Sequence, residues 1–353
     1  MRGKHFLSVI AMVTIMAVLI AGCGGASQSQ KSGGASGGGP TQGSEGGQQA
    51  PQIVLKAGHN QVPEYPHGKI IHYFAEKVAE LSNGRIKVEV FDNGTLGQED
   101  QLFQGMMAGT IDMGKASSSV VGTAVPSFRV FDLPYLLRDR EHMFSLLKGE
   151  FGEQLLKEME EKAGVKGLIW MDQGSRSFYT VNKPIRTPDD LKGLKIRVIN
   201  SEIMVDTINA MGAAATPMAF GELYTAFQQG IVDGAENAPD AVYYAKQYEV
   251  VKYFSMTHHF RTPVLFMMSM KSWEKLSQED QEIILAAAKD AEEWGLDLYQ
   301  AEMDNLLAEM QQAGMEIIED VDLDAFRAAV QSVYDKHQDA IGVDLINKIR
   351  NYQ

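Results

Sequence analysis

The sequence predicts an α/β protein of two domains behind an N-terminal secretory segment. From Gln52 onward, short apolar stretches alternate with longer stretches whose apolar residues recur at helical spacing. Roughly 300 residues follow that point, which is enough for two domains. The whole chain is 44% hydrophobic and 22% charged, a composition typical of a soluble globular protein.

Residues 1–22 have the order of a secretory signal peptide. A short basic segment precedes an apolar run over residues 6–20, and small residues then lead to Cys23. The run is short for the alternative, an uncleaved spanning helix. The small residues before Cys23 resemble a bacterial lipobox. This implies that Cys23 becomes the lipidated, palmitate-bearing first residue of the mature protein.

Residues 23–51 predict a flexible tether behind the lipid. They are almost entirely Gly, Ser, Gln, Ala, Thr and Pro, so they contain too little apolar surface to fold. Cys23 is the only cysteine among 353 residues, which excludes an intrachain disulfide and a thiolate metal cluster.

The folded part begins with the order strand, helix, strand, helix, strand, which predicts a parallel sheet with right-handed crossovers. These elements are expected at residues 53–57, 67–81, 86–90, 100–108 and 111–113. A second set follows, with strands at 167–171, 177–181, 194–199, 231–232 and 264–270 and helices at 201–211 and 220–229. Residues 277–312 predict one long helix that Gly295 could kink, and residues 324–336 a shorter last helix.

Charge and motifs exclude several classes of function. A formal net charge of −14 argues against nucleic acid or anionic lipid as a partner, and an anionic ligand would need local arginines. The sequence contains no nucleophile elbow, phosphate loop or dinucleotide-binding glycine motif. His258 and His259 are adjacent and would face opposite sides of a strand, so we expect no metal ligand and no cofactor.

Three polar residues stand where an α/β sheet would place a ligand. Arg197 lies near the carboxyl end of the strand at 194–199, just before a helix N-terminus, where its guanidinium could pair with a carboxylate. Arg176 stands between two strands where the chain could pass between domains, and Asn237 follows a Gly-bounded strand end. The alternatives are a rim arginine in a surface ion pair for Arg197 and a capped turn for Asn237.

Several ordered motifs together resemble the DctP family of TRAP transporter substrate-binding proteins, from Ile53 onward. These motifs are Gly94–Gly97, Gly109–Gly114, Phe131–Tyr135, Gly174–Arg176, Asn182–Ile185, Asp190–Arg197, Thr216–Phe220, Glu222–Tyr224 and Asp233–Asn237. One departure is Ser175, where many members have an aromatic residue or Thr.

The resemblance implies a two-lobed, periplasmic-binding-protein-like fold with a hinge and a long helix that spans both lobes. Lobe one is expected at residues 52–174 and about 262–302, and lobe two at about 175–261 and 303–353. In the family, the arginine matching Arg197 pairs with the ligand carboxylate. Arg176 and Asn237 would assist it, and Phe220 would line the pocket. Further contacts from lobe one are expected from Asn60, Glu99 and Ser117.

The resemblance further implies an extracytoplasmic protein that captures a small organic acid by domain closure and delivers it to TRAP membrane permease subunits. The motifs look most like those of members that bind a hexuronate, D-glucuronate or D-galacturonate, while a C4-dicarboxylate or an aldonate is the alternative ligand. A monomer on the outer face of the cytoplasmic membrane or in the periplasm is expected. Other open readings are a secreted carbohydrate-active enzyme, a receptor-only binding module, and binding that a metal assists.

Overall fold

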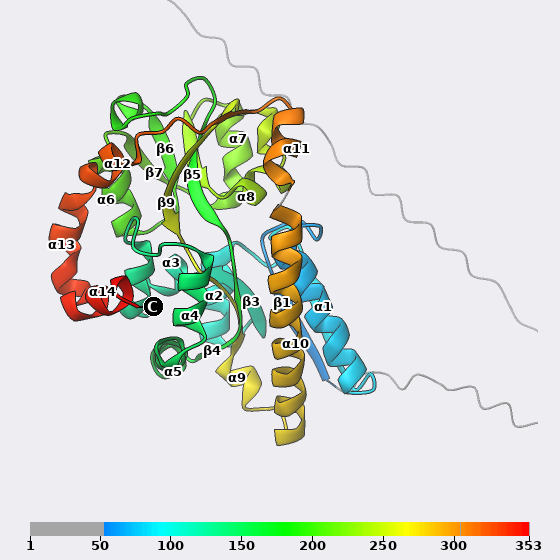
Figure 1. Ribbon diagram of the computed structural model, residues 1–353. Coiled ribbons are helices and arrows are strands. Elements are labelled where there is room, and N and C mark those ends of the chain that lie inside the picture. Colours follow the sequence, from blue (N-terminus) through cyan, green and yellow to red (C-terminus); the bar gives the residue numbers. More distant parts are fainter. Residues whose placement is uncertain (1–52, 304, 353) are drawn as a thin grey trace, which may run out of the picture. The chain divides into compact units, whose positions relative to one another are not determined.

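The computed structural model describes residues 53–303 and 305–352, and its strands form two sheets (Figure 1). The first sheet has the order β2-β1-β3-β10-β4 and the second β11-β9-β5-β8-β6-β7. We call the first sheet with its helices lobe one and the second with its helices lobe two. The signal peptide (1–22), Cys23 and the tether (23–51) lie outside the described residues.

The strands have the following bounds: β1 Ile53–Gly58, β2 Ile86–Phe91, β3 Met113–Ser117, β4 Val165–Met171, β5 Ser175–Thr180, β6 Lys195–Val198, β7 Ala214–Pro217, β8 Gly234–Asn237, β9 Tyr253–Arg261, β10 Val264–Ser269 and β11 Glu316–Ile318. The α-helices are α1 Pro66–Leu81, α2 Glu99–Ala108, α3 Ser118–Val121, α4 Arg140–Leu147, α5 Glu150–Ala163, α6 Glu202–Ala210, α7 Leu223–Gln228, α8 Pro239–Tyr244, α9 Met270–Trp273, α10 Gln278–Met303, α11 Leu306–Gln312, α12 Leu323–Ala329, α13 Gln331–Ile341 and α14 Val343–Arg350. Short 3-10 helices are η1 Pro126–Asp132, η2 Pro188–Leu191, η3 Phe220–Glu222 and η4 Gln247–Glu249.

Local chemistry explains the elements that the sequence predicted well. Helix α1 begins with Pro66, and proline is tolerated in the first helical turn because the N–H that it lacks would have no partner there. The helix ends where Asn83 and Gly84 adopt positive φ angles of 51° and 78°, the left-handed conformation that stops a helix. Helix α6 begins with an N-cap, since the Ser201 side chain accepts a hydrogen bond from the Met204 N–H.

The prediction of parallel sheets is right for only part of each sheet. Strand β1 runs parallel to β2 and β3, but β10 pairs antiparallel with β3 and β4. In the second sheet β6 is parallel to β7 and β8, while β5 is antiparallel to β8 and β9. Strands β5 and β10 each follow directly after a passage of the chain from one sheet to the other. Neither strand is therefore joined to a parallel neighbour by a crossover helix, and each pairs antiparallel.

Two predicted strands begin later than expected. The strand placed at 111–113 starts at Met113 and continues to Ser117, because the backbone N–H groups of Thr110 and Ile111 donate to the Gly105 carbonyl of α2. The strand placed at 231–232 is β8, which starts at Gly234. The sequence did not predict strands β7, β9 and β11.

The long helix predicted at 277–312 is two helices, α10 and α11. Gly295 does not end α10; a Cβ there would lie 2.6 Å from Ile70 Cδ1, so this glycine allows α10 to pack closely on α1. Near its end, α10 touches both lobes, because Glu302 accepts hydrogen bonds from Lys69 Nζ (2.7 Å) and from the Tyr244 hydroxyl. The last predicted helix, 324–336, is likewise divided between α12 and α13.

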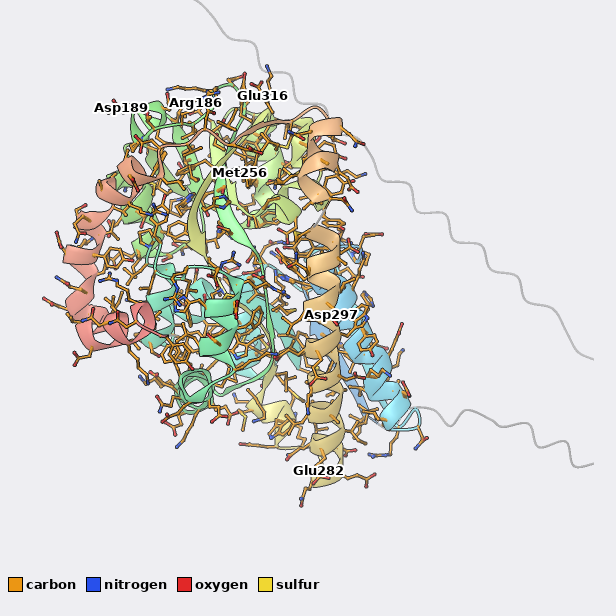
Figure 2. All side chains as sticks on the ribbon, in the orientation of Figure 1. Arg186, Asp189, Met256, Glu282, Asp297 and Glu316 are labelled. Atoms are coloured by element: carbon orange, nitrogen blue, oxygen red, sulfur yellow. The ribbon has the colours of Figure 1, made fainter. Side chains whose placement is uncertain are left out.

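The chain passes between the two sheets at residues 172–174, at 262–263 and again between α10 and α11. Helix α14 returns towards lobe one, where the Ile349 carbonyl lies 2.9 Å from His142 Nε2 of α4. The lobe boundaries predicted from the family stay a prediction. Charged side chains such as Glu282 and Asp297 on α10 and Glu316 on β11 are exposed (Figure 2). Within the described residues, no helix is both long and apolar enough to span a membrane.

Candidate functional site

A cavity of about 470 Å³ is lined by residues of both lobes, and its volume lies within the range of small-molecule sites. It lies at the carboxyl ends of β1, β6 and β8, the sheet edge at which α/β proteins bind ligands. The lining residues are Asn60, Gln61, Gln98, Glu99, Asp100, Val120, Gln173, Arg176, Arg197, Ile199, Asn200, Pro217, Met218, Ala219, Phe220, Glu222 and Asn237.

Arg197 is a buried cation without a partner of opposite charge among the described residues. Strand β6 directs Ile196 and Val198 into the core and Arg197 towards the cavity, because successive side chains of a strand point to opposite faces. The side chain is only 3% exposed, and its one hydrogen bond to a described residue runs from Nε to the Met218 carbonyl at 2.8 Å. Burial lowers the pKa of Arg197, although nearby Tyr179 and Glu236 oppose the shift. Its terminal N–H groups therefore remain available to an anion.

Arg176 has the opposite situation, because its charge is balanced within the protein. Its Nε and Nη2 donate to the two carboxylate oxygens of Glu236 at 2.6 and 2.8 Å, and Nη1 donates to Asn237 Oδ1 at 2.8 Å. Both Arg176 and Glu236 are fully buried. Burial alone would lower the pKa of Arg176, but the Glu236 carboxylate outweighs burial and raises it. Arg176 thus holds the cavity wall in shape with most of its donors.

Asn237 is oriented by its neighbours. Its Oδ1 accepts hydrogen bonds from Arg176 Nη1, from Gln173 Nε2 at 3.2 Å and from the Ala238 N–H at 2.9 Å. Because the carbonyl side of the amide is occupied, the Nδ2 group is left to donate, and it makes no hydrogen bond to the described residues. Asn237 can therefore offer a donor to an oxygen in the cavity.

Lobe one contributes a second balanced ion pair. Glu99 Oε1 accepts from Lys115 Nζ at 2.7 Å and Oε2 from the Ser117 N–H at 3.0 Å, while Lys115 also donates to Asn60 Oδ1 at 3.2 Å. Burial would raise the pKa of Glu99, but the Lys115 charge and these hydrogen bonds outweigh it and lower the pKa. Ser117 does not line the cavity, so the structure gives it contact with Glu99 and not with the cavity.

Phe220 lies on the cavity wall at the start of η3, next to a contact between the lobes. The Gly221 N–H donates to Gln98 Oε1 at 3.2 Å, and Asn60 Nδ2 donates to the same oxygen at 3.5 Å. Gln98 therefore connects the two walls of the cavity.

Six of the seven predicted binding residues, all except Ser117, line this one cavity. That they bind a ligand stays a prediction. Sequence reasoning missed Lys115, Gln98 and Gln173. Only Lys115 left a recognisable signal, a lone lysine in the short, otherwise uncharged stretch from Met113 to Ser117, and the family's motif did not draw attention to it.

Residues 57–340 match the family described as bacterial extracellular solute-binding protein, family 7, also named DctP. The chain is 35% identical over 274 residues to a solute-binding protein of Chromohalobacter salexigens, covering 78% of this chain and 81% of that protein. A TRAP periplasmic solute-binding protein of Sulfitobacter sp. NAS-14.1, solved with β-D-galacturonate, is 36% identical with a TM-score of 0.81, covering 84% of this chain and 99% of the other. One from Polaromonas sp. JS666, solved with D-erythronate, is 32% identical with a TM-score of 0.82, covering 85% and 98%.

Two lobes around a cavity that holds a buried arginine without a carboxylate partner in the described part of the chain are the architecture of a solute-binding protein. The chain belongs to the DctP family of TRAP solute-binding proteins. The family resemblance and the fold class inferred from the sequence are therefore confirmed.

Proposed function

We propose that this protein captures a hexuronate, D-glucuronate or D-galacturonate, whose carboxylate pairs with Arg197 while the two lobes close around the sugar. The observation that carries the proposal is the unbalanced charge of Arg197, which is buried with most of its donors free. A guanidinium matches a carboxylate with two parallel hydrogen bonds, and burial strengthens that pairing.

The charges around the cavity favour one carboxylate and not two. Arg176 is neutralised by Glu236 and Lys115 by Glu99, so Arg197 provides the single excess positive charge among these residues. The second carboxylate of a C4-dicarboxylate would have no free cation and would meet Glu99 on the opposite wall. A hexuronate or an aldonate instead presents hydroxyls to Glu99, Asn60 and Asn237, whose oxygens and amides suit them. An aldonate therefore remains the second candidate, in line with the erythronate-bound neighbour.

The site supports capture without turnover. A glycoside hydrolase needs a protonated carboxyl group as general acid, but Lys115 holds Glu99 in its carboxylate form by lowering its pKa against the effect of burial. Glu236 is occupied by Arg176. Neither Glu99 nor Glu236 is therefore placed to act as a general acid, and an enzyme is the less favoured function.

The family supports a role in transport, and the sequence around Cys23 suggests the anchor. The protein would deliver its ligand to TRAP permease subunits as a monomer, held at the membrane by lipid on Cys23, and it would need no cofactor. A receptor-only role would differ in one respect: deleting the permease genes would leave the ligand-dependent response intact.

The decisive experiment is a calorimetric titration of the protein with D-glucuronate, D-galacturonate, D-erythronate and succinate. A binding isotherm for a hexuronate, with succinate at least about a hundredfold weaker for want of a second free cation, would support the proposal. Tighter binding of succinate would overturn the argument from charge, and release of a cleavage product from any uronide would favour the enzyme. Repeating the titration in EDTA tests whether a metal assists binding.

A further inference from the structure

We propose that His59, His72 and Asp92 of lobe one form a binding site for a divalent transition metal of the zinc class, beside the ligand cavity but separate from it. This goes beyond the sequence prediction, which expected no metal ligand, and it does not depend on which solute the cavity binds. The imidazole Nε2 or Nδ1 atoms and carboxylate oxygens of the three residues lie within 4.8 Å of one another.

The backbone brings the three side chains together. His59 follows β1 and Asp92 follows β2, and these parallel strands pair Gly58 with Phe91, so the next residue of each emerges at the same sheet edge. His72 comes from α1, which packs on this sheet.

Backbone hydrogen bonds hold both strand ends in place. The His59 N–H donates to the Phe91 carbonyl at 3.1 Å, and the Gly94 N–H donates to the His59 carbonyl at 2.9 Å. Three separate elements therefore present ligands from a fixed frame, as a preorganised metal site requires.

The side chains converge on one carboxylate oxygen. His59 Nε2 lies 2.6 Å and His72 Nε2 lies 2.9 Å from Asp92 Oδ1. His59 is fully buried, yet neither of its ring nitrogens makes a hydrogen bond of acceptable geometry to a described residue. A buried imidazole that lies 2.6 Å from a carboxylate oxygen without the geometry of a hydrogen bond is the feature that points to an ion.

The donor set indicates which metal. Two imidazole nitrogens and one carboxylate oxygen suit Zn²⁺, Co²⁺ or Ni²⁺, whereas Ca²⁺ and Mg²⁺ prefer oxygen ligands throughout. Tetrahedral bonds of about 2 Å separate neighbouring ligand atoms by roughly 3.3 Å, so both nitrogens would move away from Asp92 by less than about 1 Å. The side chain of His72 is 41% exposed and that of Asp92 23%, which gives the ion an entry path. Solvent can then supply the fourth ligand.

The nearby charges permit a cation. Lys115 acts electrostatically on His59, but its own ammonium group is paired with Glu99. A second cluster of Glu202, Asp206 and His337 differs here, because Lys336 Nζ already contacts Asp206 Oδ2 at 2.6 Å and supplies the positive charge. That second cluster provides a matched control, since it contains a histidine beside an aspartate but should bind no metal.

The test is a titration of the full chain, without an affinity tag, with ZnCl₂ by calorimetry and with CoCl₂ by visible absorption. We expect one equivalent of Zn²⁺ to bind and raise the unfolding midpoint, and Co²⁺ to give the absorption of a tetrahedral complex. His72→Gln and Asp92→Asn should each weaken Zn²⁺ binding at least about tenfold, because loss of a ligand should cost no less than loss of a supporting hydrogen bond. His337→Gln should leave it unchanged.

Two outcomes would overturn the proposal. One is the absence of saturable Zn²⁺ binding to the unaltered chain at micromolar concentration, in protein whose circular dichroism shows it to be folded. The other is binding that persists equally in both variants, which would place the ion elsewhere. Because His72 is partly exposed, His72→Gln should fold normally, and its ligand-free unfolding midpoint measured in EDTA separates loss of the metal from loss of the fold.

Discussion

Replacing Arg197 by Met should abolish most solute affinity without weakening the fold. Arg197→Met removes the guanidinium but keeps an unbranched side chain of similar length. Truncating one partner of a buried, hydrogen-bonded charge pair costs about 2–5 kcal/mol, which corresponds to a loss of affinity between about 30-fold and several thousandfold. The free energy of unfolding should change by no more than about 1 kcal/mol, because two effects of the substitution oppose each other. It removes one hydrogen bond, to the Met218 carbonyl, and it also removes a buried charge that has no partner among the described residues.

Arg176→Met, in contrast, should strongly destabilise the fold. Removal of Arg176 leaves the fully buried Glu236 carboxylate without its cation, which typically costs about 3–5 kcal/mol. The two buried arginines thus differ in a way that no property of the arginine itself explains. The difference lies in whether the protein or the solute supplies the balancing carboxylate.

The assay combines calorimetric titration with D-glucuronate or D-galacturonate and urea unfolding without ligand. Lys195→Met is the matched control, because Lys195 lies on the same strand with its side chain exposed and should leave both quantities unchanged. Affinity of the Arg197 variant within threefold of the unaltered protein would refute the pairing. A larger loss of stability for Arg197→Met than for Arg176→Met would refute the account of the charges.

Three further predictions concern the cavity and its surroundings. Gly221→Ala should weaken solute binding by about fivefold, because a Cβ there would lie 2.7 Å from Gln98 Nε2 and displace the Gln98 side chain, which accepts from the Gly221 N–H. Calorimetry measures the affinity, and an unchanged value would contradict the role of this contact between the lobes. Glu99→Gln should lower the free energy of unfolding by about 3 kcal/mol because it leaves Lys115 buried without an anion, and a urea midpoint equal to that of the unaltered protein would contradict this. Asp132 should make the fold less stable as pH rises, because burial raises its folded pKa to about 6 from 3.8. Its contribution to the free energy of unfolding is full below about pH 4 and is lost as the pH rises through about 6. Asp132→Asn should therefore flatten the dependence of the urea midpoint on pH between about pH 4 and 7.

The sequence predicted those elements whose own residues decide their structure. The strand around Arg197 and the end of the first helix at Leu81 depend on neighbours in the chain, and both are present in the structure. Strand β9 was missed because its polar residues, such as Thr257 and His259, are buried by partners distant in sequence. The prediction of a single helix at 277–312 was wrong because helical periodicity does not show that the two ends of this segment pack on different lobes.

The candidate site shows the same division. Arg197 could be placed at a sheet edge from spacing alone, but the sequence does not reveal whether an arginine has a partner. Glu236 is part of the motif Asp233–Asn237 that the sequence analysis named. Its pairing with Arg176, 60 residues earlier in the chain, depends on the antiparallel register of β5 and β8. Lys115 was missed for the same reason, since its partner Glu99 comes from a separate element, α2. Pairing between elements distant in sequence is what the pattern could not supply.

The repeated passage of the chain between the two sheets has a consequence for proteolysis. A protease that cuts once in residues 172–174 would not free either lobe, because the same polypeptide passes back at 262–263 and again from α10 to α11. The two fragments would also remain interleaved, since β4 and β10 pair across the cut within one sheet. The nicked protein should therefore elute from a sizing column as a single particle and separate into two bands only after denaturation.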